Sequence, residues 1–300
     1  MEFYSSGKLL LTSEYVVLSG AKALSLPTQF GQHMVVSLQD EQSIHWKSID
    51  CYGDIWFENE FIYPNFDVIK SVDSAVEFRL IQLLNFIKNN CTINLKSKGY
   101  RIETTLEFDR DWGLGSSSSL VANLSKWSKA NPINLLHAAF KGSGYDVATG
   151  LENESILYQI QAGEPSWQPT TFNPDFKDQL FFVYLGTKQN TEKEIINFDV
   201  SQIDSNTINS FNMLTDSFIN CNNVNEFSEL IEQHESLMSG LLNRPTVKQA
   251  LFSDYSNVIK SLGAWGGDFV LVVGQNKQHK YFQDKGYQTI MSWQEMILNS

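Results

Sequence analysis

The chain has 300 residues, of which 42% are hydrophobic, so it can bury the core of one large domain or of two ordinary ones. Its 22 basic and 34 acidic residues give a net charge of −12, which argues against nucleic acid and anionic membrane surfaces as partners. An anionic substrate would therefore have to be held by a few local cations and by backbone N–H groups.

The cysteines and the N-terminus bear on the compartment. Three cysteines, at positions 51, 91 and 221, are widely spaced and form no CxxC pair, which argues against a zinc site and a disulfide framework. The N-terminus lacks a basic segment followed by a long apolar one, and apolar runs such as LFFVYL at 180–185 are far too short to span a bilayer. We expect a cytoplasmic protein without a nucleic-acid or membrane partner, either a monomer or a homodimer.

The first hundred residues are expected to be mostly β-structure. Lys8–Leu18, which is rich in Leu, Val and Tyr, predicts a strand, a turn around Thr12–Glu14 and a second extended piece. Further strands are expected at His33–Leu38, Ser43–Lys47, Asp54–Phe57 and Tyr100–Phe108. Apolar residues at helical spacing then predict helices at Ser74–Lys88, Ser117–Lys129 and Ile133–Phe140.

A domain boundary is expected at Gly163–Pro169, where two prolines in a polar stretch end any helix and favour extended chain. Beyond it the pattern predicts strands at Gln179–Leu185 and Phe269–Val273 and helices at Ser205–Asn220, Asn225–Leu242 and Thr246–Tyr255. The sequence therefore predicts an α+β protein with two domains, residues 1–166 and 167–300.

The segment DWGLGSSSSL at 111–120 places two glycines and four serines directly before an apolar, helix-like run. Gly113 and Gly115 permit backbone conformations and a close ligand approach that a Cβ would hinder. A helix that begins at the serines exposes unpaired N–H groups and partial positive charge, which together favour an anion, most often phosphate. The alternative interpretation is a tight turn in which a serine caps the helix.

This loop is not a Walker A phosphate-binding loop, since the sequence has no GxxxxGK[ST] segment. The sequence also lacks the HRD and DFG triplets of protein kinases. The loop does resemble the second motif of the GHMP kinases, the superfamily of galactokinase, homoserine kinase, mevalonate kinase and phosphomevalonate kinase. SGKLLLTSEYVVL at 6–18 is similar to the first motif of that family, with Lys8 and Glu14 at matching positions. Ser6 and Ser13 stand where the family usually has Pro and Gly.

KSLGAWGGD at 260–268 resembles the third motif of the family, with Trp265 in place of a glycine. Three motifs in the family's order imply its fold, an N-terminal ribosomal-protein-S5-like β/α domain followed by a C-terminal ferredoxin-like α+β domain. They also imply an ATP-dependent kinase that phosphorylates a small-molecule alcohol, with ATP and Mg²⁺ as cofactors.

HAAFKGSGYDVA at 137–148 is similar to an element of the phosphomevalonate kinase branch. The resemblance implies that Asp146 orients, or accepts a proton from, the hydroxyl that attacks the γ-phosphate. The alternative for Asp146 is a simple helix N-cap. We expect phosphomevalonate as the acceptor and a place in the mevalonate (isoprenoid) pathway, with mevalonate kinase or a catalytically silent ligand-binding regulator as the alternatives.

The resemblance assigns the site residues as follows. Asp146 and Lys8 are expected to be catalytic. ATP-phosphate contacts are expected from Gly113, Leu114, Gly115, Ser116, Ser117 and Ser118, and Mg²⁺ ligation from Ser116 and Ser117. Substrate contacts are expected from Glu14, Tyr15, Ser143, Gly144, Tyr145, Lys188, Gly263, Ala264, Gly266 and Gly267. Because residues 112–145 contain no Asp or Glu, Mg²⁺ would depend on serine hydroxyls, ATP oxygens and water.

Other conspicuous side chains are expected to be structural. The histidines at 33, 45, 234 and 279 lack metal-ligand spacing, and aromatic residues such as those at 56, 57, 61, 66 and 78 are expected in the core. Trp265 is also expected to pack in the core. The glutamates at 226, 229, 232 and 235, at helical spacing, predict a solvated helix face.

Overall fold

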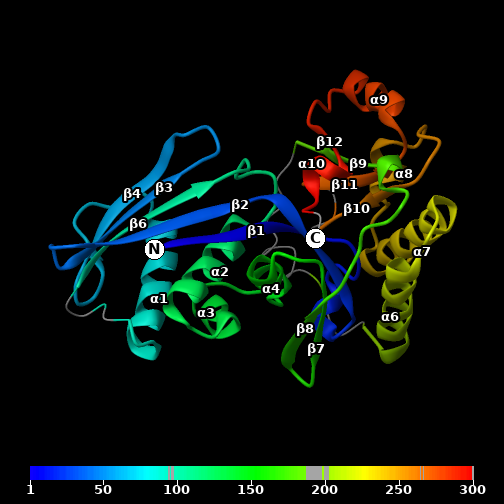
Figure 1. Ribbon diagram of the computed structural model, residues 1–300. Coiled ribbons are helices and arrows are strands. Elements are labelled where there is room, and N and C mark those ends of the chain that lie inside the picture. The colour runs from blue at the N-terminus through cyan, green and yellow to red at the C-terminus, as the bar shows by residue number, and fades with distance from the viewer. Residues whose placement is uncertain are drawn as a thin grey trace. The chain divides into compact units, whose positions relative to one another are not determined.

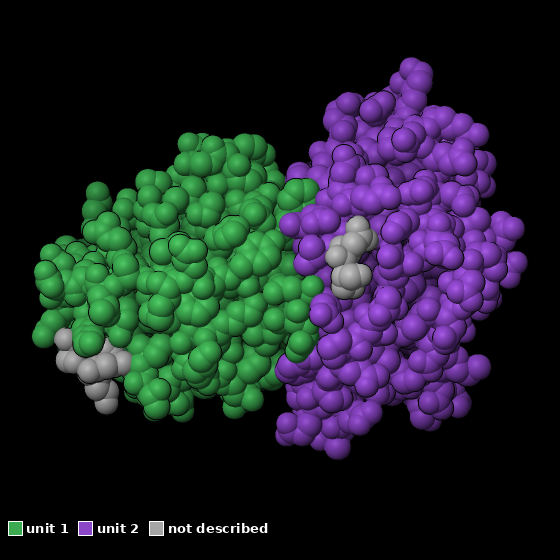
Figure 2. All heavy atoms as spheres, viewed as in Figure 1, with its two compact units in different colours: residues 1–7, 30–110, 114–153 green, residues 8–29, 111–113, 154–300 purple. Residues whose placement is uncertain are grey.

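The computed structural model describes residues 1–93, 95, 98–186, 198, 203–263, 265 and 267–298. By its internal contacts the chain forms two compact units (Figure 2). Unit 1 comprises residues 1–7, 30–110 and 114–153, and unit 2 comprises residues 8–29, 111–113 and 154–300. Strands β1 (Glu2–Leu10) and β2 (Ala23–Gln39) each contribute residues to both units. The expected division at residues 166 and 167 stays a prediction.

Unit 1 is a mixed sheet covered by helices (Figure 1). The strands follow the order β5 (Asp67–Val68), β4 (Ile55–Ile62), β3 (Ser43–Ile49), β6 (Gly99–Leu106) and β2, and β1 also pairs with β2. Strands β3 and β6 run parallel, while β2 and β6 and also β3 and β4 run antiparallel. The helices are α1 (Ser74–Asn90), α2 (Ser116–Ser128), α3 (Pro132–Ala139) and α4 (Tyr145–Glu152).

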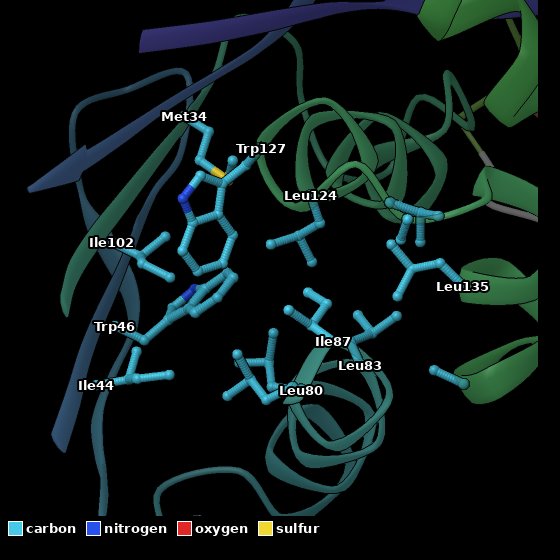
Figure 3. Packing of buried hydrophobic residues seen from close by; sticks show 14 of the residues in the cluster. Met34, Ile44, Trp46, Leu80, Leu83, Ile87, Ile102, Leu124, Trp127 and Leu135 are labelled. Carbon is cyan, nitrogen blue, oxygen red and sulfur yellow. The ribbon is translucent and has the colours of Figure 1, made fainter. Parts of the chain in front are cut away.

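The core of unit 1 lies between this sheet and its helices (Figure 3). Alternate residues of the strands point inward, among them Trp46 on β3 and Ile102 on β6, and both are fully buried. Leu80, Leu83 and Ile87 come from one face of α1, at the three- and four-residue spacing that the sequence shows. The indole N–H of Trp46 donates to the Ser48 hydroxyl (3.0 Å), so this buried donor is satisfied.

Unit 2 contains a four-stranded antiparallel sheet in the order β10 (Ile259–Ser261), β11 (Phe269–Val273), β9 (Leu180–Tyr184) and β12 (Ile290–Ser292). Helices α6 (Ser205–Asn220), α7 (Val224–Leu242) and α8 (Val247–Leu251) follow β9, and α9 (His279–Asp284) connects β11 to β12, while α10 (Trp293–Met296) ends the unit. This β-α-β-β-α-β connectivity and strand order are those of a ferredoxin-like fold. The expected α+β class is therefore confirmed.

The region after α4 forms a hairpin of β7 (Ile156–Gln161) and β8 (Glu164–Pro169). The extended conformation expected of residues 164–169 is confirmed. The second extended piece expected before Ser19 is wrong, because Val16–Ser19 forms a 3-10 turn that Gly20 ends in the left-handed conformation (φ 95°). Most other expected elements are present, and α6 and β11 have the expected bounds.

Two expectations about single side chains are also wrong. Phe78 is 59% exposed, although Phe57, Phe61 and Phe66 are buried as expected. Glu235 is only 4% exposed, so the expected glutamate face of α7 is not wholly solvated. Among the described residues, none of the helices combines the length and the apolar character needed to cross a membrane.

Candidate functional site

The glycine-serine loop leads directly into α2 in unit 1. Gly115 occupies the N-cap in the left-handed conformation (φ 93°), which favours glycine, and the helix begins at Ser116. No side chain caps this helix, so the alternative of a serine N-cap is wrong. The first-turn N–H groups have no partner within the helix and carry its positive dipole end, as an anion site requires. Leu114 is fully buried and anchors the loop.

The hydroxyls of the loop serines fall into two classes. Ser118 donates its hydroxyl to the Gly115 carbonyl (2.9 Å), so it serves the helix start. The Ser116 side chain is half-buried and Ser117 is exposed, and within the described part of the chain neither hydroxyl makes a hydrogen bond. The two serines expected to ligate Mg²⁺ are thus those with hydroxyls available to a ligand.

Hydroxyl oxygens suit Mg²⁺, a hard cation that retains several waters and uses few protein ligands. The described residues contain no group of three or more His, Cys, Asp or Glu side chains arranged to hold a metal. Ser116 and Ser117 therefore fit an ion that is shared with the oxygens of a bound phosphate, and they do not fit a metal held by protein ligands alone.

Asp146 is the second residue of α4, and its side chain is half-buried. Gly144 provides the N-cap of α4 in the left-handed conformation (φ 91°), so the alternative role of Asp146 as an N-cap is wrong. The N–H of Val147 donates to Asp146 Oδ1 (3.0 Å). Ser143 and Gly144 are buried beside it, while Tyr145 is half-buried.

Helices α2 and α4 pack against each other within unit 1. Both begin at a left-handed glycine and neither has a side-chain cap. The phosphate-loop serines and Asp146 are therefore carried by neighbouring helices of one compact unit. This juxtaposition cannot be read from the sequence spacing.

In unit 2 the structure brings parts of all three motifs together. The Lys8 ammonium donates to the Gly113 carbonyl (2.8 Å). The Cα of Gly113 faces Asp268 so closely that a Cβ at position 113 would overlap its carboxylate. Gly263 also lies near this carboxylate, since a Cβ there would be 3.9 Å from Asp268 Oδ2. Asp268, 7% exposed, was not among the expected site residues, although it ends the segment KSLGAWGGD.

The contact between Gly113 and Asp268 predicts the effect of a single methyl group. Gly113→Ala should cost about 1–3 kcal/mol of unfolding free energy beyond backbone strain, because the new Cβ overpacks against a buried carboxylate. Gly53→Ala is the matched control, since Gly53 also has positive φ (88°) but open space where its Cβ would lie. Denaturant titration of both variants checks this, and equal losses would show that the contact is not tight.

Glu14 lies in the interior of unit 2, with 1% of its surface exposed. Lys260 donates to its Oε1 (2.8 Å), and Oε2 lies 3.2 Å from Nε2 of His234. Lys260 is itself fully buried and also lies 3.6 Å from Oε1 of Glu235. The buried ion network is thus one ammonium, two carboxylates and one imidazole. A direct substrate contact by Glu14 stays a prediction that this burial does not support.

The network holds titratable groups with displaced pKa values. Burial raises the pKa of Glu235 to about 7, helped by the charge of Glu14 and opposed by Lys260. Burial likewise raises the pKa of Glu14 and lowers that of His234 well below its ordinary value. His234 is therefore neutral, and the only cation in the network is Lys260, which both carboxylates share.

Glu235 should make stability depend on pH near neutrality. Its pKa is about 7 in the folded chain against 4.5 ordinarily, so folding takes up a proton between these values. The stabilising contribution is therefore present at low pH and is lost as the pH rises through 7. Glu235 should by itself lower the free energy of unfolding by ~1 kcal/mol between pH 6.5 and 8.

Denaturant titrations across this range test the dependence, with Glu235→Gln as the comparison. The pKa of His234 lies well below its ordinary value of 6.5 in the folded chain, so unfolding at pH 6.5 protonates about half of this imidazole, and His234 adds a smaller slope of the opposite sign. That slope is present in both proteins, so the Gln variant should differ from the wild type by losing the fall that Glu235 causes. An equal slope in both proteins would assign the pH dependence to other groups.

The other expected substrate-contacting residues lie in mixed surroundings. The ring of Tyr15 is buried, and its Oη accepts a hydrogen bond from the backbone N–H of Trp265 (3.3 Å). Trp265 packs in a cluster with Val16, Phe211 and Met238, so its expected core position is confirmed. Gly267 is buried. Lys188, Ala264 and Gly266 lie outside the described residues.

Comparisons of the sequence with known proteins find no match, whereas the comparison with solved structures does. No protein-family model matches the chain, and no curated protein sequence matches it significantly. Solved structures do match it over nearly the whole length. One is the mevalonate kinase of Methanococcus jannaschii, with a TM-score of 0.65 and 16% identity over 97% of this chain and 96% of that one.

Streptococcus pneumoniae phosphomevalonate kinase, in complex with phosphomevalonate and AMPPNP, matches with a TM-score of 0.68 and 16% identity over 97% of this chain and 99% of that one. Lactococcus lactis galactokinase with galactose gives a TM-score of 0.66 and 12% identity over 100% and 93% of the two chains. The chain has the fold of the GHMP kinases. At such identities the GHMP kinase fold is what is shared, and the chemistry must be argued from the residues.

Proposed function

We propose that the protein is an ATP-dependent GHMP-type kinase of the mevalonate pathway that transfers the γ-phosphoryl group of ATP to phosphomevalonate. One observation carries the proposal. Helices α2 and α4 pack together, each begins at a left-handed glycine, and they carry the available hydroxyls of Ser116 and Ser117 and the carboxylate of Asp146. A helix N-terminus for phosphate beside a helix with a carboxylate in its first turn suits phosphoryl transfer to an alcohol.

The chemistry assigns a role to each group. The loop N–H groups at 113–118 hold ATP phosphates, and Ser116 or Ser117 supplies a hydroxyl to Mg²⁺, which neutralises phosphate charge when bound. Asp146 orients the acceptor hydroxyl and takes up its proton as the new oxygen–phosphorus bond forms and the bond to ADP breaks. Since the transition state is loose, positioning and charge stabilisation supply most of the catalysis.

Lys8 is proposed as the cation for the transferred group. Its ammonium donates to the Gly113 carbonyl (2.8 Å), which holds this cation against the loop. With a net charge of −12 on the chain, such a local cation is what an anionic substrate needs. Phosphomevalonate is preferred over mevalonate because of the likeness of residues 137–148 to the phosphomevalonate kinase branch.

The test is ADP release by the purified protein with ATP and Mg²⁺, offered phosphomevalonate, mevalonate, homoserine and galactose in parallel. Turnover on phosphomevalonate alone would support the full proposal. Turnover on another acceptor would keep the kinase and correct the substrate. ATP binding without turnover on any acceptor would favour the alternative of a ligand-binding regulator.

A further inference from the structure

Lys126, in the last turn of α2, lies half-buried between two helices and a strand of unit 1. Its ammonium donates to the Tyr4 carbonyl on β1 (2.6 Å), to the Ser5 hydroxyl (3.0 Å) and to the Gly150 carbonyl on α4 (3.0 Å). All three donors of the ammonium are used on groups of the protein. A surface lysine would keep its ammonium in water, so this arrangement requires an explanation.

A chain of hydrogen bonds continues from Lys126 to the first turn of α2. The Ser5 hydroxyl donates to Asn123 Oδ1 (2.9 Å), and Asn123 Nδ2 donates to the Gln32 carbonyl (2.8 Å). Gln32 Oε1 accepts from the hydroxyl of Ser119 (3.1 Å). Ser5, Asn123 and Ser119 are buried, so each of these bonds is shielded from water. The network therefore spans α2 from the residues beside the phosphate loop to Lys126.

Helix α4 packs closely against β1 and α2 at Gly150. Gly150 has no Cβ, and one placed there would lie 3.1 Å from the Ser6 carbonyl and 3.5 Å from the Cβ of Ala122 on α2. Gly150 is one turn beyond Asp146 in a helix of eight residues. A single helical turn is rigid and rises about 5–6 Å, so a shift at Gly150 is transmitted to Asp146.

The Gly150 carbonyl is one of the last four of α4, which have no partner within the helix and carry negative partial charge. A cation is the favoured ligand for such a group. Burial lowers the pKa of Lys126 to about 8, while Glu152 opposes the shift. The fold thus keeps a partly desolvated ammonium between α2 and α4.

We propose that Lys126 is a positioning residue for phosphoryl transfer, which fixes α4, and with it Asp146, against the helix that carries Ser116 and Ser117. The inference rests on the proposed kinase function. Lys126 itself is not placed at the substrate. It acts by fixing the position of α4 relative to α2, and its contact on α4 is the Gly150 carbonyl.

Lys126→Met tests the role, because Met keeps the length and apolar stem of Lys but none of its donors. We expect kcat to fall at least 10-fold while the KM for ATP changes less than about 3-fold, since misplaced reacting groups affect the transition state more than ground-state binding. Lys129→Met is the matched control, because Lys129 is exposed at the C-cap of the same helix. It should leave both constants unchanged.

Gly150→Ala provides a second variant that keeps every donor and instead pushes α4 away from Ser6 and Ala122. We expect the same loss in kcat. Gly240→Ala is its control, since Gly240 also lies in a helix, α7, and has open space where its Cβ would lie. Unaltered kcat in both Lys126→Met and Gly150→Ala, with the fold intact, would overturn the proposal.

Hydrogen exchange of the 145–152 amides separates this inference from the proposed function. Lys126→Met should speed exchange in α4 relative to Lys129→Met, whether or not an acceptor has been found. If the wild type turns over none of the acceptors, the proposed function fails while exchange still decides whether Lys126 clamps α4. Unchanged exchange in α4 would overturn the clamp even if the protein is an active kinase.

Discussion

Asp146→Asn is expected to lower kcat by about 10²–10⁴-fold and to leave folding intact. The carboxamide keeps the shape of the carboxylate but does not accept a proton from the attacking hydroxyl. The side chain does not cap α4, and its Oδ1 accepts a hydrogen bond from the Val147 N–H that an Asn oxygen also accepts. We therefore expect the unfolding free energy to change by less than ~0.5 kcal/mol.

Steady-state ADP release and an ATP titration together check this result, because nucleotide affinity should be retained. Asp73→Asn is the matched control within unit 1. Asp73 caps α1 by accepting from the N–H groups of Ala75 (3.0 Å) and Val76 (3.2 Å), and Asn is an equally good cap. Near-normal turnover in Asp146→Asn would remove this residue from the mechanism.

The sequence predicts elements well where a single local signal decides them. The apolar period of α6 and the apolar run of β11 predict the bounds that the structure has. It fails at Val16–Ser19, where β-branched residues favour a strand. Tyr15 has a positive φ (61°) and Gly20 adopts the left-handed conformation (φ 95°), so the chain turns here instead of continuing as a strand, and Glu14 lies in the interior.

The sequence suggests candidate site residues where the chemistry is contiguous, as in the glycine-serine loop and in the residues around Asp146, and their roles stay predictions. The contact of Asp268 with Gly113 and the Lys126 clamp were not predicted, because they depend on which segments the fold brings together. Glu235 is the clearest case. Its three-residue spacing from other glutamates suggests solvent, and only the burial of Lys260 beside it explains its position.

Lys260→Met is expected to be the most destabilising of these substitutions, at about 3–5 kcal/mol, because it leaves the carboxylate of Glu14 buried without a cation. For a chain of this size the loss corresponds to a fall in Tm on the order of 10 °C. Thermal unfolding at pH 6 measures it. At that pH Glu235, with a pKa of about 7, is mostly protonated, so Glu14 is the group left uncompensated.

Two further variants separate the ion pair from the loss of lysine itself. Lys22→Met removes the same side chain from a pair with Asp216 at a similar distance (2.7 Å), but with the two side chains 30% and 49% exposed. That loss should be no more than ~1 kcal/mol, since water solvates the remaining charge. Glu14→Gln combined with Lys260→Met should recover most of the stability, because the double variant buries no unpaired charge. If the double variant is as unstable as Lys260→Met alone, the network stabilises the fold through its hydrogen bonds and packing, and charge compensation between Glu14 and Lys260 is not the cause.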